Sequence, residues 1–359
     1  MNRPHEGHSV FQYLGNPFKR VSFQRSSEKS SKLNHIWNAF EISLTERLKR
    51  LEAKIPKDMI DLSWMQQAIE FLSATHADFK SLIANLRFPA TEWNEKWKDE
   101  YLDDTVKLLD ICIALNAEIS KREHFQLLVH YVLHLLDFSG GNWSNDKLFR
   151  AKDCLKELME KTDLNRKTCL NSQRNGKIEN CSVILQGMSN SLQFGKGKSS
   201  ARDRVFLRAV YALKATTIFV CSVAVSALAG HPGLLIELKI PDHLLWSAAF
   251  MSLQEEINDE IKKCFTEGRV GVVKEIETLD AAIENVHSTV EKVAVDMVEG
   301  TEKVEEIRIA VQELKQSVEL VGQGLAPLTK QVNNFFQVVL SGRNALLDSL
   351  RLSEIVSHE

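Results

Sequence analysis

The sequence predicts an all-α fold, an elongated multi-helix bundle with a long C-terminal helix or coiled-coil hairpin. Apolar residues recur at steps of three and four positions along most of the chain, which is the spacing of one face of a helix. No segment alternates between apolar and polar residues with the period of two that is typical of strands. Prolines number only 7 among 359 residues, so long helices meet few breakers.

The clearest pattern is a ladder of apolar residues that begins at Val272 and continues for about seven heptads, with Gly300 in the one slot that fails. Such a narrow apolar seam must be buried. We expect the ladder to be the spine of one intramolecular bundle, with its end around Gly300 protruding as a partner-binding tip. An intermolecular coiled coil is the alternative. The ladder consists of Val272, Ile276, Leu279, Ile283, Val286, Val290, Val293, Met297, Val304, Ile307, Val311, Leu314, Val318 and Val321.

The chain divides into three predicted regions. Residues 1–32 carry six Lys or Arg against two acids and are expected to be a flexible basic arm. Residues 33–250 are expected to form a helical bundle. Residues 251–353 would hold the long heptad helix and, after the break at Pro327, a return helix over 328–350.

Within the bundle, apolar stripes and breakers predict successive helices joined by polar loops at 162–176 and 193–200. Ser63 is the expected N-cap of the second helix. The predicted helices cover 33–53, 63–86, 91–119, 125–138 and 146–161.

An apolar helix predicted over 205–229 has two interpretations. Its charge-free part, 215–229, would span about 22 Å as a helix, short of the roughly 30 Å hydrocarbon core of a bilayer. Extension back to Ala209 gives enough length but includes Lys214, which would have to snorkel to the membrane surface. The segment is rich in Ala, Ser, Thr and Cys, which suits a crowded bundle centre at least as well. A buried core helix and a membrane-inserted helix both remain open.

Basic residues gather between Lys147 and Arg208, where 14 Lys or Arg face 6 Asp or Glu. A solvated helix face is one explanation, and contact with anionic lipid on the cytosolic side of a membrane is the other. The net charge of −3 gives no reason to expect a nucleic-acid partner. The residues for a membrane contact would be Lys196, Lys198, Arg202, Arg204 and Arg208.

Six cysteines lie far apart with no CxxC pair, so we expect reduced, structural thiols in an intracellular protein rather than a zinc site. The loop from Gly195 to Ser199 resembles a phosphate loop, but that motif needs glycine where Leu192 stands. His130 and His134 share a helix face without the glutamate of a zinc-protease helix. The sequence therefore predicts no catalytic, cofactor-binding or metal-binding residues and no enzyme.

One acidic segment leaves an alternative open. Asp99 with Asp103, and Glu100 with Asp104, are spaced so that each pair projects from one helical face. All-α terpenoid synthases use a similar acidic helix to hold Mg²⁺ against a diphosphate, because Mg²⁺ prefers carboxylate oxygens. The second magnesium motif of those enzymes is missing, because Lys262 stands where it needs Ser or Thr. A solvated acidic face is the simpler interpretation.

Several fragments, taken in order, resemble the plant BYPASS-like protein family across essentially the whole chain. Each fragment is weak alone, and their shared order makes the match specific. The fragments are Gly15-Asn16-Pro17-Phe18, Asn38-Ala39-Phe40-Glu41, Glu46-Arg47-Leu48, Leu62-Ser63-Trp64-Met65, Trp93-x-x-Lys96-Trp97, Tyr101-Leu102-Asp103, the run from Val106 to Ile113, Ile178-Glu179-Asn180-Cys181, Arg208-Ala209-Val210-Tyr211 and Val220-Cys221.

The resemblance implies a plant developmental regulator without established catalytic residues. Proteins of the BYPASS type restrain production of a root-derived mobile signal that arrests shoot growth, and a related branch is linked to the exocyst tethering machinery. Members are labelled chloroplastic or membrane-associated. We therefore expect a non-enzymatic scaffold that acts through protein partners, which are exocyst-related in one version, and either a cytosolic membrane surface or the chloroplast as its location.

Overall fold

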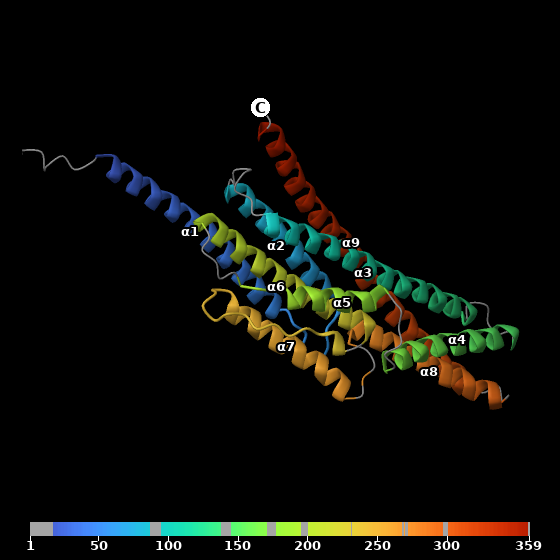
Figure 1. Ribbon diagram of the computed structural model, residues 1–359. Helices are drawn as coiled ribbons and strands as arrows, with labels where there is room; N and C mark the ends of the chain where they lie inside the picture. The colour runs from blue at the N-terminus through green and yellow to red at the C-terminus, as the bar shows by residue number, and fades with distance from the viewer. Residues whose placement is uncertain are drawn as a thin grey trace, which may run out of the picture.

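The computed structural model is an elongated bundle of long helices (Figure 1). It describes residues 17–86, 95–137, 145–170, 177–194, 200–230, 232–267, 269, 272–296 and 301–357. Over these residues the chain forms α-helices, one short 3-10 turn and no strand beyond an isolated bridge between Ile60 and Val273. The helices are α1 (Pro17–Glu52), α2 (Leu62–Leu86), α3 (Glu95–Leu135), α4 (Asn145–Leu170), α5 (Lys177–Asn190), α6 (Ala201–Ala229), η2 (Pro232–Leu234), α7 (Ser247–Thr266), α8 (Lys274–Asp296) and α9 (Thr301–Ser357).

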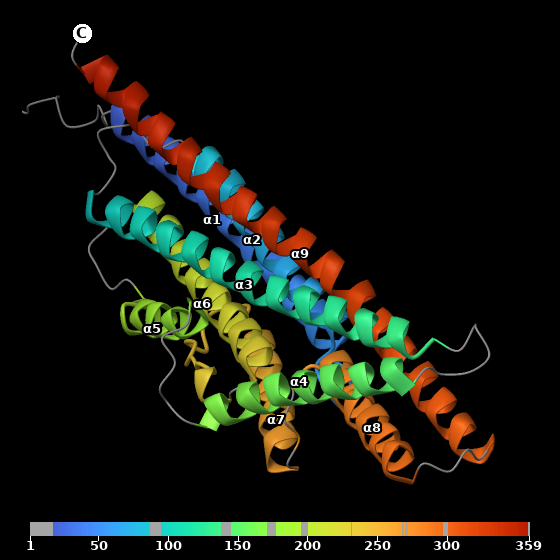
Figure 2. The ribbon, with the colours of Figure 1, turned by 90° about the vertical axis from the view of Figure 1, so that its right-hand side faces the viewer.

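Helix α9 is the spine of this bundle. It packs against α2, α3 and α8, and Figure 2 shows α1, α2, α3 and α9 running along one another on one side, with α4 crossing α3 and α8 near the end of the bundle. The prediction of an all-α bundle with a long C-terminal helix is confirmed.

The ladder is divided between α8 and α9, which pack against each other as a hairpin. Asn285 of α8 donates from Nδ2 to Glu313 Oε2 of α9 at 3.1 Å. Ladder residues such as Val290, Leu314 and Val318 are fully buried, whereas Val304 is 42% exposed. The expected single long helix is therefore wrong and the hairpin form is correct, because the apolar edges of α8 and α9 cover each other. Gly300 lies outside the described residues.

The expected break at Pro327 does not occur, because α9 continues through this residue to Ser357. A proline inside a helix removes one hydrogen bond and clashes with the preceding turn. Here the helix is held on both sides of Pro327 by buried Leu325 and Leu328. The segment 328–350 is thus a continuation of α9 and not a return helix.

Three helix boundaries also differ from the sequence-based expectation. Helix α1 begins at Pro17, inside the segment 1–32 expected to be a flexible arm. Proline is tolerated at the first helical position, and no proline or glycine follows until after Glu52. Helix α3 joins two expected helices for the same reason, and α4 continues to Leu170, into the loop expected over 162–176. Residues 1–16 lie outside the described part of the chain.

The start of α2 is fixed by carboxylates. Asp61 Oδ1 accepts the backbone N–H of Trp64 at 2.6 Å, so Asp61 is the N-cap and not Ser63. Glu275, at the start of α8, accepts the backbone N–H of Leu62 with both oxygens at 3.1 and 3.2 Å. Burial raises the pKa of the Glu275 carboxyl. These contacts join the first turns of α2 and α8, which are more than 200 residues apart.

Helix α6 is the central helix of the bundle. Ser200 and Asp203 form a capping box at its start, and Gly230 ends it with a φ of 67°, in the left-handed region that favours glycine. It is the one described helix that is long and apolar enough to cross a membrane, and 94% of its most apolar window is buried by protein. In this fold α6 is therefore a core helix, as the first interpretation of the segment 205–229 held.

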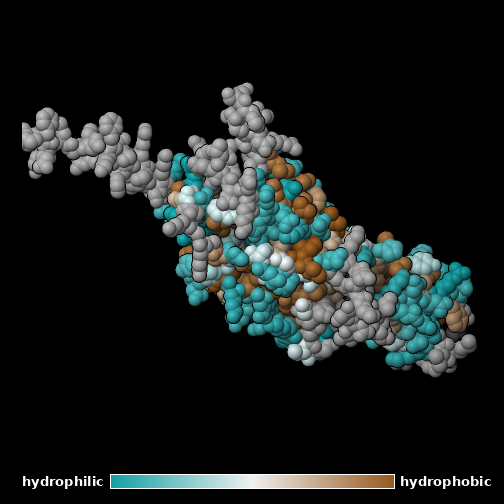
Figure 3. All heavy atoms as spheres, viewed as in Figure 1, coloured by the Kyte–Doolittle hydropathy of each residue, from teal (hydrophilic) through white to brown (hydrophobic). Residues whose placement is uncertain are grey.

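Apolar residues also reach the surface. Figure 3 shows them in a strip across the middle of the face viewed, between hydrophilic residues at either end. The exposed side chains of α3 include Val106, Ile113, Leu127 and Tyr131. Helix α3 thus has an outer face that is not covered by the described helices.

Two helical glycines give a matched test of the packing. A Cβ added to Gly324 of α9 would lie 2.5 Å from Leu62 Cδ1, whereas one added to Gly187 of α5 meets nothing within 4 Å. We expect Gly324→Ala to lower the free energy of unfolding by about 1–3 kcal/mol through overpacking. Gly187→Ala should raise it by about 0.5–1 kcal/mol, because alanine favours the helix. Urea unfolding followed by circular dichroism measures both, and equal effects of the two changes would contradict the close approach of α9 to α2.

Candidate functional site

Polar side chains converge at two places in the bundle. One is a buried cluster around Lys214, lined by residues of α2, α3, α5 and α6. The other is an open cleft between α3 and α9.

Lys214 lies in the apolar part of α6 and is 6% exposed. Its Nζ lies 2.7 Å from Asp104 Oδ2 and 3.1 Å from Glu100 Oε1, and it donates to Ser191 Oγ at 2.9 Å. The membrane-inserted interpretation would require this side chain to snorkel, whereas in the bundle α3 supplies two carboxylates that bind it. A buried ammonium requires such partners.

The acidic segment of α3 is neutralised by lysines. Asp104 faces Lys214, and Lys107 Nζ lies 2.6 Å from Asp103 Oδ2 and 3.5 Å from Asp104 Oδ1. The hydrogen bond that the Lys107 ammonium donates to Asp103 raises the pKa of Lys107. Asp99 is exposed. This arrangement counts against the magnesium interpretation. In each of the two pairs, Asp99 with Asp103 and Glu100 with Asp104, at least one carboxylate is bound by a lysine.

The interior beside Lys214 contains a cavity of about 20 Å³, room for a single water molecule. His76 of α2 and Thr217 of α6 line it, with Nε2 and Oγ1 3.1 Å apart. Burial lowers the pKa of His76 to about 3 and raises that of Tyr101 to about 12. Both side chains are therefore neutral at physiological pH.

Helix α9 is tied to the same region of α3. Arg343 donates from Nη1 to the carbonyl of Leu102 and to Thr105 Oγ1 at 3.1 Å. Sequence reasoning noted Lys214 and Asp104 separately but did not connect them. Their contact joins residues more than 100 positions apart, and the one local signal was a single lysine in an apolar helix.

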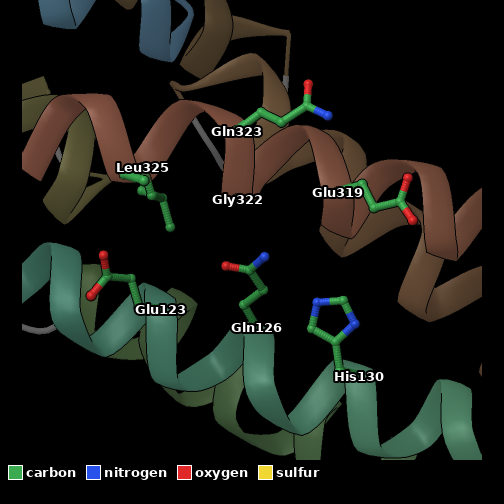
Figure 4. Close-up of a pocket in the computed structure, with 8 residues that line it drawn as sticks. Glu123, Gln126, His130, Glu319, Gly322, Gln323 and Leu325 are labelled. Carbon is green, nitrogen blue, oxygen red and sulfur yellow. The ribbon is translucent and has the colours of Figure 1, made fainter.

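The cleft between α3 and α9 has a volume of about 470 Å³. Figure 4 shows Gln126 standing between the two helices, with Glu123 beside it on α3 and Glu319 above His130. Gln126 Nε2 donates to the carbonyl of Val318 at 3.2 Å. Gly322 lies directly opposite, where any side chain would meet the Gln126 amide. The close contact of a side-chain amide with a glycine thus forms the floor of the cleft.

The acidic side chains of the cleft are those of Glu123 and Glu319, and no lysine or arginine is among the described residues that line it. Thr329 Oγ1 donates to Glu123 Oε1 at 3.3 Å, which orients that carboxylate. Sequence reasoning considered His130 with His134 for metal binding. In the structure His130 lines the cleft, and no group of three His, Cys, Asp or Glu among the described residues could hold a metal ion.

The residues proposed for membrane contact lie at the start of α6. Arg204 and Arg208 are exposed and Arg202 is half-buried, while Lys196 and Lys198 lie outside the described residues. Arg208 is close enough to the carboxyl of Glu41 to oppose the rise in its pKa that burial causes. Two of the five proposed residues are thus exposed at one end of the central helix.

The cysteines whose surroundings the structure describes are all free thiols. Four of them, Cys112, Cys181, Cys221 and Cys264, are buried. Burial raises the pKa of Cys112 to about 12 and that of Cys181 to about 11. These thiols stay protonated and unreactive at neutral pH, as structural cysteines do.

Removal of the Lys214 ammonium tests the buried cluster. We expect Lys214→Met to lower the free energy of unfolding by about 3 kcal/mol, because Asp104 keeps a buried charge without its main partner. Adding Asp104→Asn should restore at least half of that loss. The control is Lys262→Met, whose pair with Glu237 is exposed on both sides and should contribute less than about 1 kcal/mol. Equal losses for both lysines, measured by urea unfolding, would contradict the structural role of Lys214.

Comparison with known proteins shows which family the chain resembles. A family model described as Protein ROH1-like matches residues 11–183 and 172–350. Protein BPS1, chloroplastic, of Arabidopsis thaliana is 33% identical over 98% of this chain and 93% of its own length. Protein ROH1D of the same plant is 23% identical over 87% of both chains. No solved structure matches the chain.

The rice relative differs in length. UPF0496 protein 4 of Oryza sativa subsp. japonica is 37% identical over 80% of this chain, and the match spans 61% of that protein. The family match extends over nearly the whole chain, and the identity to BPS1 agrees with the resemblance that the sequence fragments carry. The chain therefore belongs to the ROH1-like family, the BYPASS-like family of plant proteins.

Proposed function

We propose that this protein is a non-enzymatic developmental regulator that acts as a scaffold for protein partners. The single observation that carries the proposal is the 33% identity to Protein BPS1 over 98% of the chain. By the family resemblance, its role is to restrain production of a root-derived mobile signal that arrests shoot growth. The polar contacts inside the bundle fit a scaffold, because buried Lys214 and Asp104 and half-buried Arg343 connect one helix to another.

Reciprocal grafting in the plant that carries the gene tests this function. A wild-type shoot on a root with the disrupted gene is expected to stop growing, and a disrupted shoot on a wild-type root to grow. Arrest that follows the genotype of the shoot would contradict the proposal. Root expression of the unaltered chain should restore growth, and so should the Asp99→Asn/Asp103→Asn variant, which a diphosphate-handling enzyme would not tolerate.

A second candidate function is favoured by the exposed Arg204 and Arg208 at the start of α6. In this version the protein lies on an anionic membrane surface and takes part in exocyst-type trafficking as a peripheral protein. Basic side chains near such a surface contribute about 1 kcal/mol each. Because α6 is buried in the bundle, the contact would be electrostatic and would not insert that helix.

Vesicle sedimentation tests the membrane contact. The full chain should bind vesicles that contain phosphatidylserine, and Arg204→Gln/Arg208→Gln should weaken binding by about tenfold or more. The matched control is Arg150→Gln/Arg308→Gln, because both of these arginines are 64% exposed and lie on other helices. Equal binding to pure phosphatidylcholine, or equal loss in both double variants, would contradict the second candidate.

A further inference from the structure

We propose that the cleft between α3 and α9 receives a lysine or arginine side chain from an amphipathic basic segment of a partner protein. This inference rests on the proposed function, which requires protein partners, and it names the surface and the chemistry of one partner. It differs from the membrane contact, because the cleft is acidic and the start of α6 is basic.

The shape of the cleft suits an inserted side chain. Its volume of about 470 Å³ falls within the range of protein sites that hold small ligands or single anchoring groups. Its floor is the contact of Gln126 with Gly322 and Val318, which holds α3 and α9 together below the opening. Because the two walls belong to long packed helices, the cleft exists without a conformational change.

The chemistry of the cleft selects a cation. Glu123 on the α3 wall and Glu319 on the α9 wall lie at opposite ends of the cleft, with Gln126 between them in Figure 4. Among the described residues that line the cleft there is no lysine or arginine. Gln126 uses an N–H for its bond to Val318 and keeps its carbonyl oxygen available, which lies on the side of Glu123 in Figure 4. A guanidinium or ammonium group at the Glu123 end would meet that carboxylate and the Gln126 carbonyl oxygen, and one at the Glu319 end would meet the second carboxylate. The acids of the buried cluster have lysine partners, whereas these two have none in the cleft.

Exposed apolar side chains beside the cleft favour a peptide as the ligand rather than a small cation. Leu127 and Tyr131 directly follow the cleft residues Gln126 and His130 in α3 and are 64% and 48% exposed. Leu320 follows Glu319 in α9 and is 53% exposed. Large apolar side chains at an opening are typical of protein-binding sites. A segment with a basic residue flanked by apolar residues would use both features, as amphipathic helices in grooves do.

The experiment uses the full chain and an array of labelled 14-residue peptides. Each peptide has a Leu, Ala and Ser host sequence with arginine at one or two positions, and matched peptides carry glutamate there. Fluorescence anisotropy should show selective binding of arginine peptides that weakens with added salt. Glu123→Gln/Glu319→Gln should weaken this binding about tenfold, and Leu127→Ser/Tyr131→Ser should weaken it as well. Circular dichroism verifies that each variant is folded.

The matched control is Glu46→Gln/Glu157→Gln, which removes two exposed carboxylates on other helices and should leave binding unchanged. Absence of selective binding anywhere in the array would overturn the proposal. Equal losses in both glutamate double variants would overturn it too. Competition by free arginine amide at the affinity of the peptides would show a site for small cations and not for a partner segment. Such failures leave the grafting result unaffected, so the two proposals are tested separately.

Discussion

The fold depends on the neutralisation of Lys214. Helix α6 contacts α1, α2, α3, α5 and α7, so it must be buried on nearly all sides, and yet it carries an ammonium group. The pair with Asp104, at 2.7 Å, makes that burial tolerable. A buried ion pair can select one register between two helices where a purely apolar interface would accept several, and the Lys214–Asp104 pair is placed to do so between α6 and α3. The apolar side chains supply most of the stability, and this contact selects one arrangement of them.

A second constraint is the length of α9, which packs against three other helices, α8, α2 and α3, along its course. Its first part lies against α8, and its remainder lies between α2 and α3. Close approach requires small residues at the crossings, and Gly324 faces Leu62 for this reason. The hairpin with α8 explains why the ladder needs no second chain, since Val290 and Val318 are already covered within one molecule.

The sequence alone predicted the elements better than their connections. Periodicity identified the helices and the burial of Leu314 and Val286, because both depend on local spacing. It left the fold-back between α8 and α9 as one of two alternatives, since an unbroken heptad pattern describes one helix or two equally well. Pro327 misled for the opposite reason: packing on both sides holds a helix that local propensity would end. The cleft escaped notice because Gln126 and Gly322 are distant in sequence and acquire meaning only when α3 and α9 meet.

The carboxylates of α3 show how one helix serves both folding and recognition. Asp104 points into the bundle and is bound by Lys214, so its charge serves the contact between α3 and α6. Glu123, about five turns further along, lies in a cleft whose described lining residues include no lysine or arginine. It accepts a hydrogen bond from Thr329 of α9, so it too contributes to the contact between two helices. A carboxylate has more acceptor capacity than this one bond uses, and the proposed cation from a partner would bind the part of Glu123 that faces the cleft.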